Sequence, residues 1–510
     1  MFILMVVIFI LGYTAIALEH PLKVDKSASA LLIGALTWAV FALDSTQILS
    51  LGYNFEWTKL ISGYQMNSEQ ISELGHAFVK HELGHHLSEI AEILFFLLGA
   101  MTIVEIVDHN QGFKLITDKI KTTNKVKLLW VLGFLTFFMS AALDNLTTTI
   151  VMVTLLRKLI SDKPTRWLFA SMVVVAANAG GAWSPIGDVT TIMLWIGGQI
   201  TAGNIIMMVF IPSLVSMIIP LIILSFTLKG DVTRPVIDKN IKTDFTTQGE
   251  KVLFLIVGVG ALLFVPIFKT VTHLPPYMGM LLGLGVIWTI SEINNRRKDE
   301  EHRNHLAVIN ILKRVDIPTV MFFLGILTAV ASLQAAGHLS QVSIWLDRVT
   351  GKNIYIIDTA IGILSSIVDN VPLVAGTMGM YEIAHIGTFA QDGVFWELLA
   401  YTAGTGGSIL IIGSAAGVAA MGMEKIDFIW YLKKISLLAL IGYLGGIGTY
   451  YFQERIVGAD EEVEVVEHKL EEEHTVIKVG EHDHIKLDTE MILKIRKQNE
   501  DGSIRTNEEE

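Results

Sequence analysis

Two short polar strings interrupt apolar segments of the chain, and each places a carboxylate directly before a carboxamide. The first contains Asp144 and Asn145 and runs into three threonines, and the second contains Asp369 and Asn370. Asp188 lies in a third apolar segment, which Gly and Pro residues interrupt. An Asp at mid-membrane depth costs at least about 2.5 kcal/mol on insertion scales, so such residues usually face a cavity and mark an ion or proton path.

The side chains around these breaks offer oxygen atoms, which are the ligands that alkali and alkaline-earth cations prefer. Burial favours the protonated form of a carboxyl group, whereas a nearby cation favours the ionised form. Competition of a cation and a proton for one carboxylate is therefore a sufficient mechanism for cation/proton exchange. The oxygen donors at the breaks are Asp144, Asn145, Thr147, Asp188, Thr190, Thr191, Asp369, Asn370, Ser408 and Ser414.

Helix capping is the structural alternative for each of these Asp residues, because Asp, Asn, Ser and Thr accept hydrogen bonds from the free N–H groups of a helix start. A single Asp-Asn pair would not distinguish capping from ion binding. Two such pairs, each matched by a Gly-rich break that carries Asp188 or Ser414, favour a functional site.

The composition is that of a polytopic membrane protein. Of 510 residues, 52% are hydrophobic and 17% are charged, and the mean hydropathy is +0.54. The sequence contains no cysteine, which excludes disulfide bonds and thiolate sites. The apolar run 2–18 has no basic stretch before it and no Ala-x-Ala site after it, so we expect the first membrane helix there rather than a signal peptide.

The apolar segments predict an all-α fold with two kinds of interrupted element. Segments 167–198 and 394–424 are too long for one upright helix and contain Gly or Pro, so we expect discontinuous helices. The arms beside Asp144, about 16 and 15 residues, are too short to cross a bilayer at 1.5 Å per residue. We therefore expect re-entrant hairpins at 128–160 and 354–388. The other spans are expected at 2–18, 28–46, 91–107, 203–228, 251–268, 277–292, 317–336 and 430–453.

Landmarks in the two halves of the chain keep one spacing, which predicts an internal repeat. The offset is 225 residues for the Asp-Asn pairs and 226 for the others. Basic residues cluster at 114–127, 157–166 and 296–303 and are expected in the cytoplasm. The first hairpin then enters from the cytoplasm and the second from outside, so the repeats are inverted around a midplane site. The matched landmarks are Asp144 with Asp369, Gly180 with Gly406, Gly187 with Gly413, and Phe96 with Phe322.

These features predict five parts of the chain. Of the net charge of −12, ten charges come from the last part, which has 18 acidic and 8 basic residues and is expected to be disordered. The parts are the N-terminal membrane helices with an outer loop at 1–78, the first repeat at 79–230, a connecting loop with two linking helices at 231–304, the inverted second repeat at 305–453, and the acidic tail at 454–510.

A His-rich stretch before the third apolar segment offers a different chemistry. His81, Glu82 and His85 match HExxH, which on a helix is the signature of a zinc protease. The pattern has only three fixed residues, and no apolar segment offers an obvious third ligand, so no zinc site is expected. The alternatives are a solvent-facing helix and a proton path or pH sensor, since His titrates near neutrality. The candidates for the latter are His85, His86, Glu89, Glu92 and Glu105.

Four strings together resemble the NhaD-type sodium/proton antiporters of the ion-transporter superfamily. The resemblance covers roughly residues 1–453 and leaves out the tail. The strings are FFLLGAMTIVEIVD from Phe95, SAALDNLTTTIVMV from Ser140, NAGGAWSPIGDVTTIMLW from Asn178, and SSIVDNVPLVAG from Ser365.

The resemblance implies export of Na+, often also Li+, in exchange for H+, with a role in pH homeostasis. It further implies a homodimer, an elevator motion of a transport domain, and a multi-pass protein of an energised membrane such as the bacterial inner (plasma) membrane. No enzyme activity, cofactor or nucleic-acid partner is expected. Cation-site roles carry over to Ser140, Asp144, Asn145, Thr147, Asn178, Asp188, Thr190, Thr191, Ser365, Asp369 and Asn370. Sodium itself is expected at Asp144, Asn145 and Asp188.

A carrier of arsenite or of a dicarboxylate from the same superfamily is the alternative. A dicarboxylate carrier should have Ser-Asn-Thr at its hairpin tips. This chain has Asp at the first position of both tips, Asp144 and Asp369, which favours a bare cation as the substrate.

Overall fold

The computed structural model describes residues 1–17, 19–62, 68–117, 119–235, 246–296, 298, 300 and 306–475. Within these ranges the chain is helical and contains no strand beyond two isolated bridges. The first part contains α1 (Phe2–Ala17), α2 (Glu19–Leu22), α3 (Lys26–Leu43), α4 (Ser45–Ser50), α5 (Phe55–Ile61), α6 (Ser68–His109) and α7 (Lys114–Thr117).

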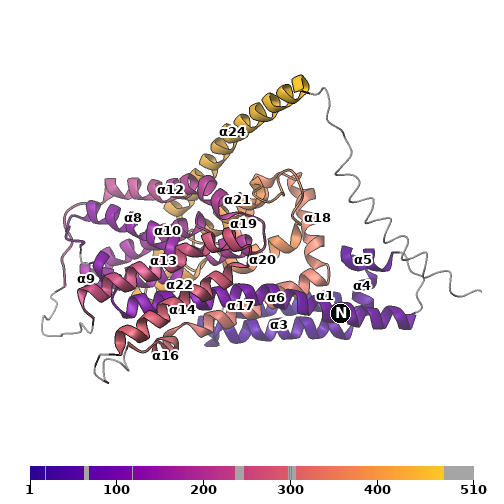
Figure 1. Ribbon diagram of the computed structural model, residues 1–510, viewed down its shortest axis with the longest axis horizontal. Coiled ribbons are helices and arrows are strands. Elements are labelled where there is room, and N and C mark those ends of the chain that lie inside the picture. Colours follow the sequence, from indigo (N-terminus) through magenta and orange to yellow (C-terminus); the bar gives the residue numbers. More distant parts are fainter. Residues whose placement is uncertain are drawn as a thin grey trace, which may run out of the picture. The chain divides into compact units, whose positions relative to one another are not determined.

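The remaining helices include the four pairs that flank the breaks in the apolar segments, namely α8 with α9, α10 with α11, α19 with α20, and α21 with α22 (Figure 1). They are α8 (Lys125–Leu143), α9 (Asn145–Leu159), α10 (Lys163–Ala182), α11 (Val189–Ile196), α12 (Ala202–Thr227), α13 (Gln248–Thr272), α14 (Pro276–Asn295), α16 (Val308–Ile311), η1 (Leu312–Arg314), α17 (Ile317–Ala335), α18 (His338–Thr350), α19 (Ile354–Leu364), α20 (Asn370–Met380), α21 (Val394–Gly406), α22 (Ala415–Glu424), α23 (Phe428–Lys434) and α24 (Ser436–Thr475).

Seven of the described helices are long and apolar enough to cross a membrane, or eight if the bent pair α23 and α24 forms one span. The seven are α3, α6, α8, α12, α13, α14 and α17. Helices α1 and α19 are apolar but shorter. An integral, multi-pass membrane protein is therefore confirmed.

Helix α8 differs from its prediction. It has 19 residues and is apolar enough to span a membrane, whereas the sequence predicts an arm of about 16 residues before Asp144. The difference arises because Asn124 caps the helix, accepting a hydrogen bond from the Lys127 backbone N–H at 3.0 Å, so the helix starts within the basic loop. A re-entrant course of this hairpin consequently stays a prediction.

One compact unit comprises residues Met1–Phe452, and Gln453–Glu510 form a second. Helix α24 continues to Thr475, into the acidic tail. The rest of the tail lies outside the described residues, and disorder there stays a prediction. The predicted boundary at residue 79 lies inside the uninterrupted α6.

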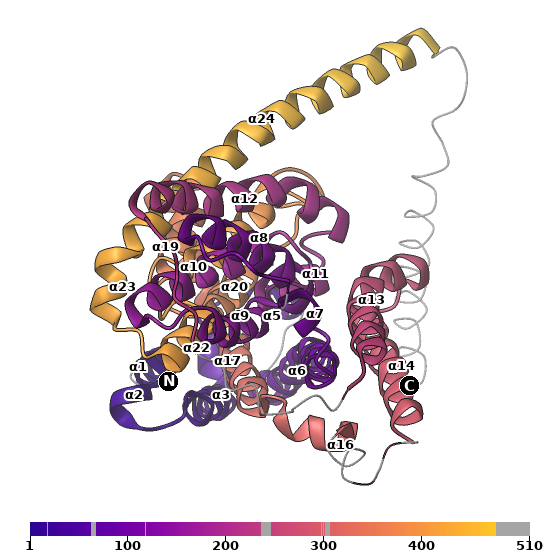
Figure 2. The same ribbon diagram turned by 90° about the vertical axis from the view of Figure 1, so that its left-hand side faces the viewer.

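Helices α10 and α21 form the centre of the first unit. All residues from Phe169 to Ala182 on α10 are buried, and so are all from Phe395 to Gly406 on α21. A helix that is buried on every side belongs in the interior of a bundle, and the two helices pack on one another. Helices α8, α9, α12, α19 and α22 each contact α10 or α21. Figures 1 and 2 show α8, α9, α12, α19 and α22 grouped around α10.

Helices α3 and α17 make the most extensive pair contact outside this centre. A side chain at Gly325 would overlap the backbone of Ala30, so the missing side chain permits the close approach. The indole N–H of Trp38 donates to the Thr328 carbonyl at 2.8 Å across the same contact. Helices α13 and α14 run side by side and pack on α6 (Figure 2). The candidate cation site lies on the interrupted helices, of which α20 contacts α17.

Candidate cation site

Glycine residues let the interrupted helices approach the two Asp-Asn strings closely. A Cβ on Gly180 would overlap the Phe137 carbonyl of α8, and a Cβ on Gly406 would overlap the Gly362 carbonyl of α19. Any side chain at either position would therefore push two helices apart. The backbones can meet only because both residues are glycine.

Two serines join the same helix pairs by equivalent hydrogen bonds. The Ser140 hydroxyl donates to the Ala177 carbonyl at 2.6 Å, and the Ser365 hydroxyl donates to the Ala403 carbonyl at 2.9 Å. Both serines are fully buried. Their hydroxyl groups link the paired helices, and neither has a hydrogen bond to Asp188 in the described chain.

Asp188 lies at the centre of a buried polar cluster. It precedes α11, and one carboxylate oxygen accepts from the Thr190 backbone N–H at 3.1 Å. The other accepts from the amide of Asn145 at 2.7 Å. The amide of Asn370 lies 3.3 and 3.2 Å from the two carboxylate oxygens. The side chains of both Asp-Asn strings thus meet on one carboxylate that is 1% exposed.

Asn178 of α10 extends this cluster to the second interrupted segment. Its amide oxygen accepts from Asn145 at 3.1 Å, while its NH2 group lies 2.9 Å from each of the hydroxyl oxygens of Ser408 and Ser414. Asn178 is fully buried. Residues from both hairpins and both discontinuous helices therefore form one hydrogen-bonded network.

Asp144 does not join Asp188 in this network. It stands between α8 and α9 with a φ of 81°, and its carboxylate accepts from Thr147 twice, at 2.8 Å from the backbone N–H and 2.7 Å from the hydroxyl. It also lines a small cavity of about 20 Å³. Of the three residues expected to bind sodium, Asn145 and Asp188 are hydrogen-bonded to one another, whereas Asp144 caps α9.

Asp369 occupies the corresponding position before α20. One of its oxygens accepts from the Val371 backbone N–H at 3.3 Å. Its own backbone N–H donates to the Tyr13 hydroxyl of α1 at 3.1 Å. Nothing in the sequence marks Tyr13, because a tyrosine in an apolar helix is ordinary. Asn178 likewise became a candidate only through the family resemblance.

The two threonines after Asp188 are buried and stay close to it. The Thr191 hydroxyl lies 3.1 Å from the Asp188 carbonyl and 3.3 Å from the Gly181 carbonyl. Ser184, which no sequence pattern marks, donates to the Ala141 carbonyl at 2.5 Å and ties this break to α8. These contacts fix the backbone that presents the Asp188 carboxylate.

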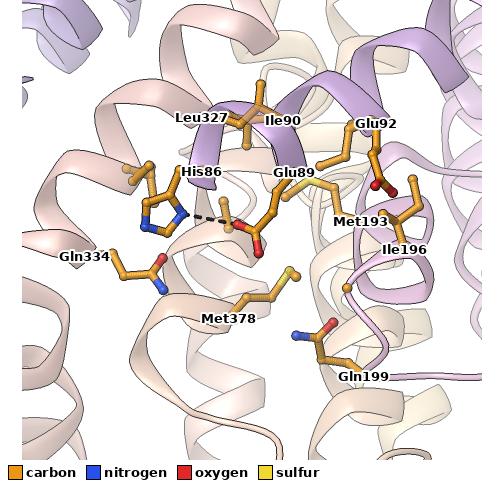
Figure 3. A pocket seen from close by; sticks show the side chains of 15 residues that line it. His86, Glu89, Ile90, Glu92, Met193, Ile196, Gln199, Leu327, Gln334 and Met378 are labelled. Atoms are coloured by element: carbon orange, nitrogen blue, oxygen red, sulfur yellow. Dashed lines mark hydrogen bonds and ion pairs between the residues drawn. The ribbon is translucent and has the colours of Figure 1, made fainter. Parts of the chain in front are cut away.

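The predicted proton-path residues separate into three groups. His86, Glu89 and Glu92 line a cavity of about 340 Å³, in which His86 Nδ1 lies 3.1 Å from a Glu89 carboxylate oxygen (Figure 3). His85 does not line this cavity: its ring Nε2 lies 3.5 Å from a Glu89 carboxylate oxygen, and its side chain is 58% exposed. Glu105 lies 13 residues after Glu92 on α6, about 20 Å along the helix axis, and does not line this cavity.

This cavity adjoins the far ends of the two helices that carry the cluster. Met193 and Ile196 of α11 and Met378 of α20 contribute to its wall, opposite His86 (Figure 3). Helix α11 begins next to Asp188, and Met193 follows five residues later, so about 7.5 Å of helix lies between the cluster and the cavity wall.

The HExxH residues lie on the exposed part of α6. The His81 side chain is 78% exposed, and the rings of His81 and His85 stack with their centroids 6.4 Å apart. Among the described residues, no group of three His, Asp or Glu side chains is arranged to hold a metal ion.

Residues 4–406 match a family described as citrate transporter. Sodium/proton antiporter 1 of Arabidopsis thaliana is 47% identical over 448 residues, 88% of this chain and 71% of the relative, and sodium/proton antiporter 2 of the same plant is 46% identical over 88% of this chain and 98% of the relative. The Na(+)/H(+) antiporter NhaD of Vibrio cholerae is 31% identical over 86% of this chain and 89% of the relative.

The family match covers most of the first compact unit. It includes Asn145, Asn178, Asp188 and Asn370 and ends before Ser408 and Ser414. The sequence resemblance to NhaD-type proteins is thereby confirmed. The chain belongs to the citrate transporter family of the ion-transporter superfamily and, within it, to the NhaD-type sodium/proton antiporters.

Proposed function

We propose that this protein exports Na+, or Li+, in exchange for H+, and that Asp188 is the carboxylate for which cation and proton compete. The observation that carries the proposal is the meeting of Asn145 and Asn370 on the buried Asp188 carboxylate. A buried carboxylate binds a proton or a cation more readily than it stays bare. The three amides supply further oxygen atoms for a cation.

Rotation of the amides converts the observed network into a cation site. Asn145 and Asn370 now turn their NH2 groups toward Asp188, which suits a carboxylate without a bound cation. A side-chain amide that rotates by half a turn presents its oxygen instead. Na+ would then have oxygen ligands from Asp188, Asn145 and Asn370, and Asp144 would supply charge nearby.

Alternating access would come from an elevator motion of the interrupted helices. Support comes from the offset of the landmarks, which is 225 or 226 residues. The two halves also make equivalent contacts: Ser365 corresponds to Ser140, and Gly406 to Gly180. Such pairing is expected of two inverted repeats that enclose a midplane site. The network across all four interrupted elements would move as one body.

The cavity beside His86 would serve as an entry path for ions. Glu89 and Glu92 give it negative charge, which attracts cations, and His86 contributes an imidazole to the same wall. Its wall reaches α11 and α20, so a movement of these helices would change the distance from the cavity to Asp188. In the cell, the exchange would support pH homeostasis.

The remaining predictions concern the assembly and the membrane. We propose a homodimer, as the family resemblance implies. A plasma membrane of a bacterium is one setting, and the similarity to two Arabidopsis thaliana proteins makes a plant membrane another. Neither point is needed for the ion chemistry at Asp188.

Transport of an organic anion such as citrate is the second candidate, which the family description favours. A carboxylate substrate needs positive charge or N–H donors. Within the described chain, the hydrogen-bond partners of Asp188, Asn178 and Asn370 include no Lys or Arg. A site with its own carboxylate and without a basic side chain suits a cation.

Everted membrane vesicles that contain a pH-sensitive dye test the proposal. Addition of NaCl or LiCl should dissipate a preformed proton gradient between pH 7 and 9, whereas citrate should have no effect. KCl and CaCl2 report on the selectivity. Absence of a response to both Na+ and Li+ over this range would disprove the proposed exchange, and a response to citrate alone would establish the second candidate.

A further inference from the structure

Asp358 is a buried carboxylate that none of the features above explains. It lies on α19 and is 0% exposed. Within the described chain, neither of its carboxylate oxygens has a hydrogen-bond partner. Capping does not account for it, because Asn353 caps α19 by accepting from the Ile356 backbone N–H at 3.2 Å.

Among the described residues, no cation compensates the charge that Asp358 would carry. Helix α19 packs mainly on α21, and the Tyr443 hydroxyl of α24 donates to the Thr359 carbonyl at 2.9 Å. The ionisable side chains close enough to interact with its charge are Tyr381 and Tyr443. The Tyr381 hydroxyl donates to Asp347 of α18 at 3.1 Å, and the described residues include no Lys or Arg in an ion pair with Asp358.

A carboxylate without partners in such a place is far less stable in its charged form than as a neutral acid. Burying an unpaired ion costs far more free energy, even after relaxation, than burying an unpaired neutral polar group. Asp358 is therefore a carboxylic acid in this conformation. The residue 225 positions earlier, in register with the Asp-Asn pairs, is Gly133, so the first hairpin has no corresponding acid.

We propose that Asp358 is a second proton-binding site, separate from the Asp188 cluster, and that it carries one proton per exchange cycle. It is 11 residues before Asp369 on the same hairpin, so the elevator motion of this hairpin would carry both residues to the other side of the membrane. The O–H bond then breaks, the proton passes to water on one side, and the carboxylate takes a proton from water on the other side before it is buried again. Over one cycle the O–H bond that breaks on one side is re-formed on the other, so one proton crosses the membrane and Asp358 returns to its neutral form.

The proposal deepens the proposed function, on which it rests, and its first test is the stoichiometry. Purified protein in proteoliposomes is compared with Asp358→Asn by finding the membrane potential at which Na+ flux reverses in set Na+ and pH gradients. The variant should move one proton fewer per Na+, and Asp358→Glu should restore the wild-type ratio. An identical ratio for the wild type and Asp358→Asn overturns the proposal. Failure of wild-type exchange would instead disprove the proposed function.

A second test does not depend on transport. The infrared difference between wild type and Asp358→Asn should contain the carbonyl stretch of a protonated carboxyl group at neutral pH. Asp358→Leu replaces the unpaired polar group by an apolar one, should fold, and should lack the same band. Absence of the band in the difference spectrum for either folded variant overturns the proposal, since the residue would then not hold a proton.

Discussion

The amide nitrogen of Asn370 lies 3.3 and 3.2 Å from the two carboxylate oxygens of Asp188, although 182 residues separate them. Asn145 of the other hairpin approaches the same carboxylate at 2.7 Å. Asp188 is therefore the one described side chain that receives hydrogen bonds from the Asn of both strings. This relationship makes the site a joint product of the two halves of the chain.

Asp188→Asn should abolish Na+-dependent proton movement while the protein remains folded in the membrane. The amide has nearly the same size but can neither bind a proton as a carboxylate does nor attract Na+ by charge. Dye dequenching in everted vesicles measures the loss. Asp427→Asn, which changes the exposed cap of α23, is the matched control and should retain exchange. Normal exchange by Asp188→Asn would reduce Asp188 to a helix cap.

Asn370→Ala should weaken the apparent affinity for Na+ by about 10- to 100-fold, because a hydrogen bond or ligand to a charged group contributes about 1.5–3 kcal/mol. Asn145→Ala should have a similar effect, since both amides contact Asp188. The Na+ concentration for half-maximal dequenching measures the change. Asn124→Ala at the exposed start of α8 should leave it unaltered. If the apparent Na+ affinities of Asn370→Ala and Asn145→Ala equal those of the control and the wild type, the two amides do not bind the cation.

Gly406→Ala should destabilise the protein by about 1–3 kcal/mol, the usual cost of overpacking. The new methyl group would overlap the Gly362 carbonyl. Gly180→Ala should destabilise the protein for the same reason, because its methyl group would overlap the Phe137 carbonyl. Thermal unfolding in detergent, followed by tryptophan fluorescence, reports the drop in melting temperature. Gly285→Ala, where nothing lies within 4 Å of the added carbon, should not lower it. An unchanged melting temperature for Gly406→Ala would contradict the close approach of α19 and α21.

Glu424→Gln should destabilise the end of α22 strongly. Its buried carboxylate accepts from Arg157 Nε at 2.7 Å and Arg166 Nε at 2.6 Å, and breaking a buried pair costs about 3–5 kcal/mol because a charge is left unpaired. The half-exposed Arg157 places the effect near the lower end of that range. Proteolysis of the folded protein, with cleavage near residue 424, measures the local opening. Resistance equal to that of the wild type would show that these ion pairs are dispensable.

His86→Gln should change the pH dependence of exchange, whereas His85→Gln should not. His86 lines the cavity with Glu89 and Glu92, while His85 is largely exposed (Figure 3). The experiment compares exchange rates between pH 6 and 9 in proteoliposomes. Identical profiles for His86→Gln and the wild type would exclude His86 from the proton path, and a shift with His85→Gln alone would reverse the assignment.

Much of the helical architecture follows from the sequence because it depends on local rules. Apolar length predicts the spans, and a Gly-rich interruption predicts a break where α10 ends at Ala182 and α11 starts at Val189 in the structure. The sequence is less informative about helix ends in polar surroundings. Helix α6 continues through the His-rich stretch from Ser68, and α24 continues to Thr475 in the acidic tail, since neither composition stops a helix.

The site shows the same division between local and long-range information. By itself, the sequence determined which oxygen donors exist, that they stand at interruptions, and that two Asp-Asn pairs share one register. The tertiary structure decided that Asp188 accepts from both Asn partners, that Asp144 turns to Thr147, and that Asp358 is left without a partner. Spacing places a residue on a helix, but a hydrogen bond requires atoms within about 3 Å. Only the packing of helices from distant parts of the chain fixes that distance.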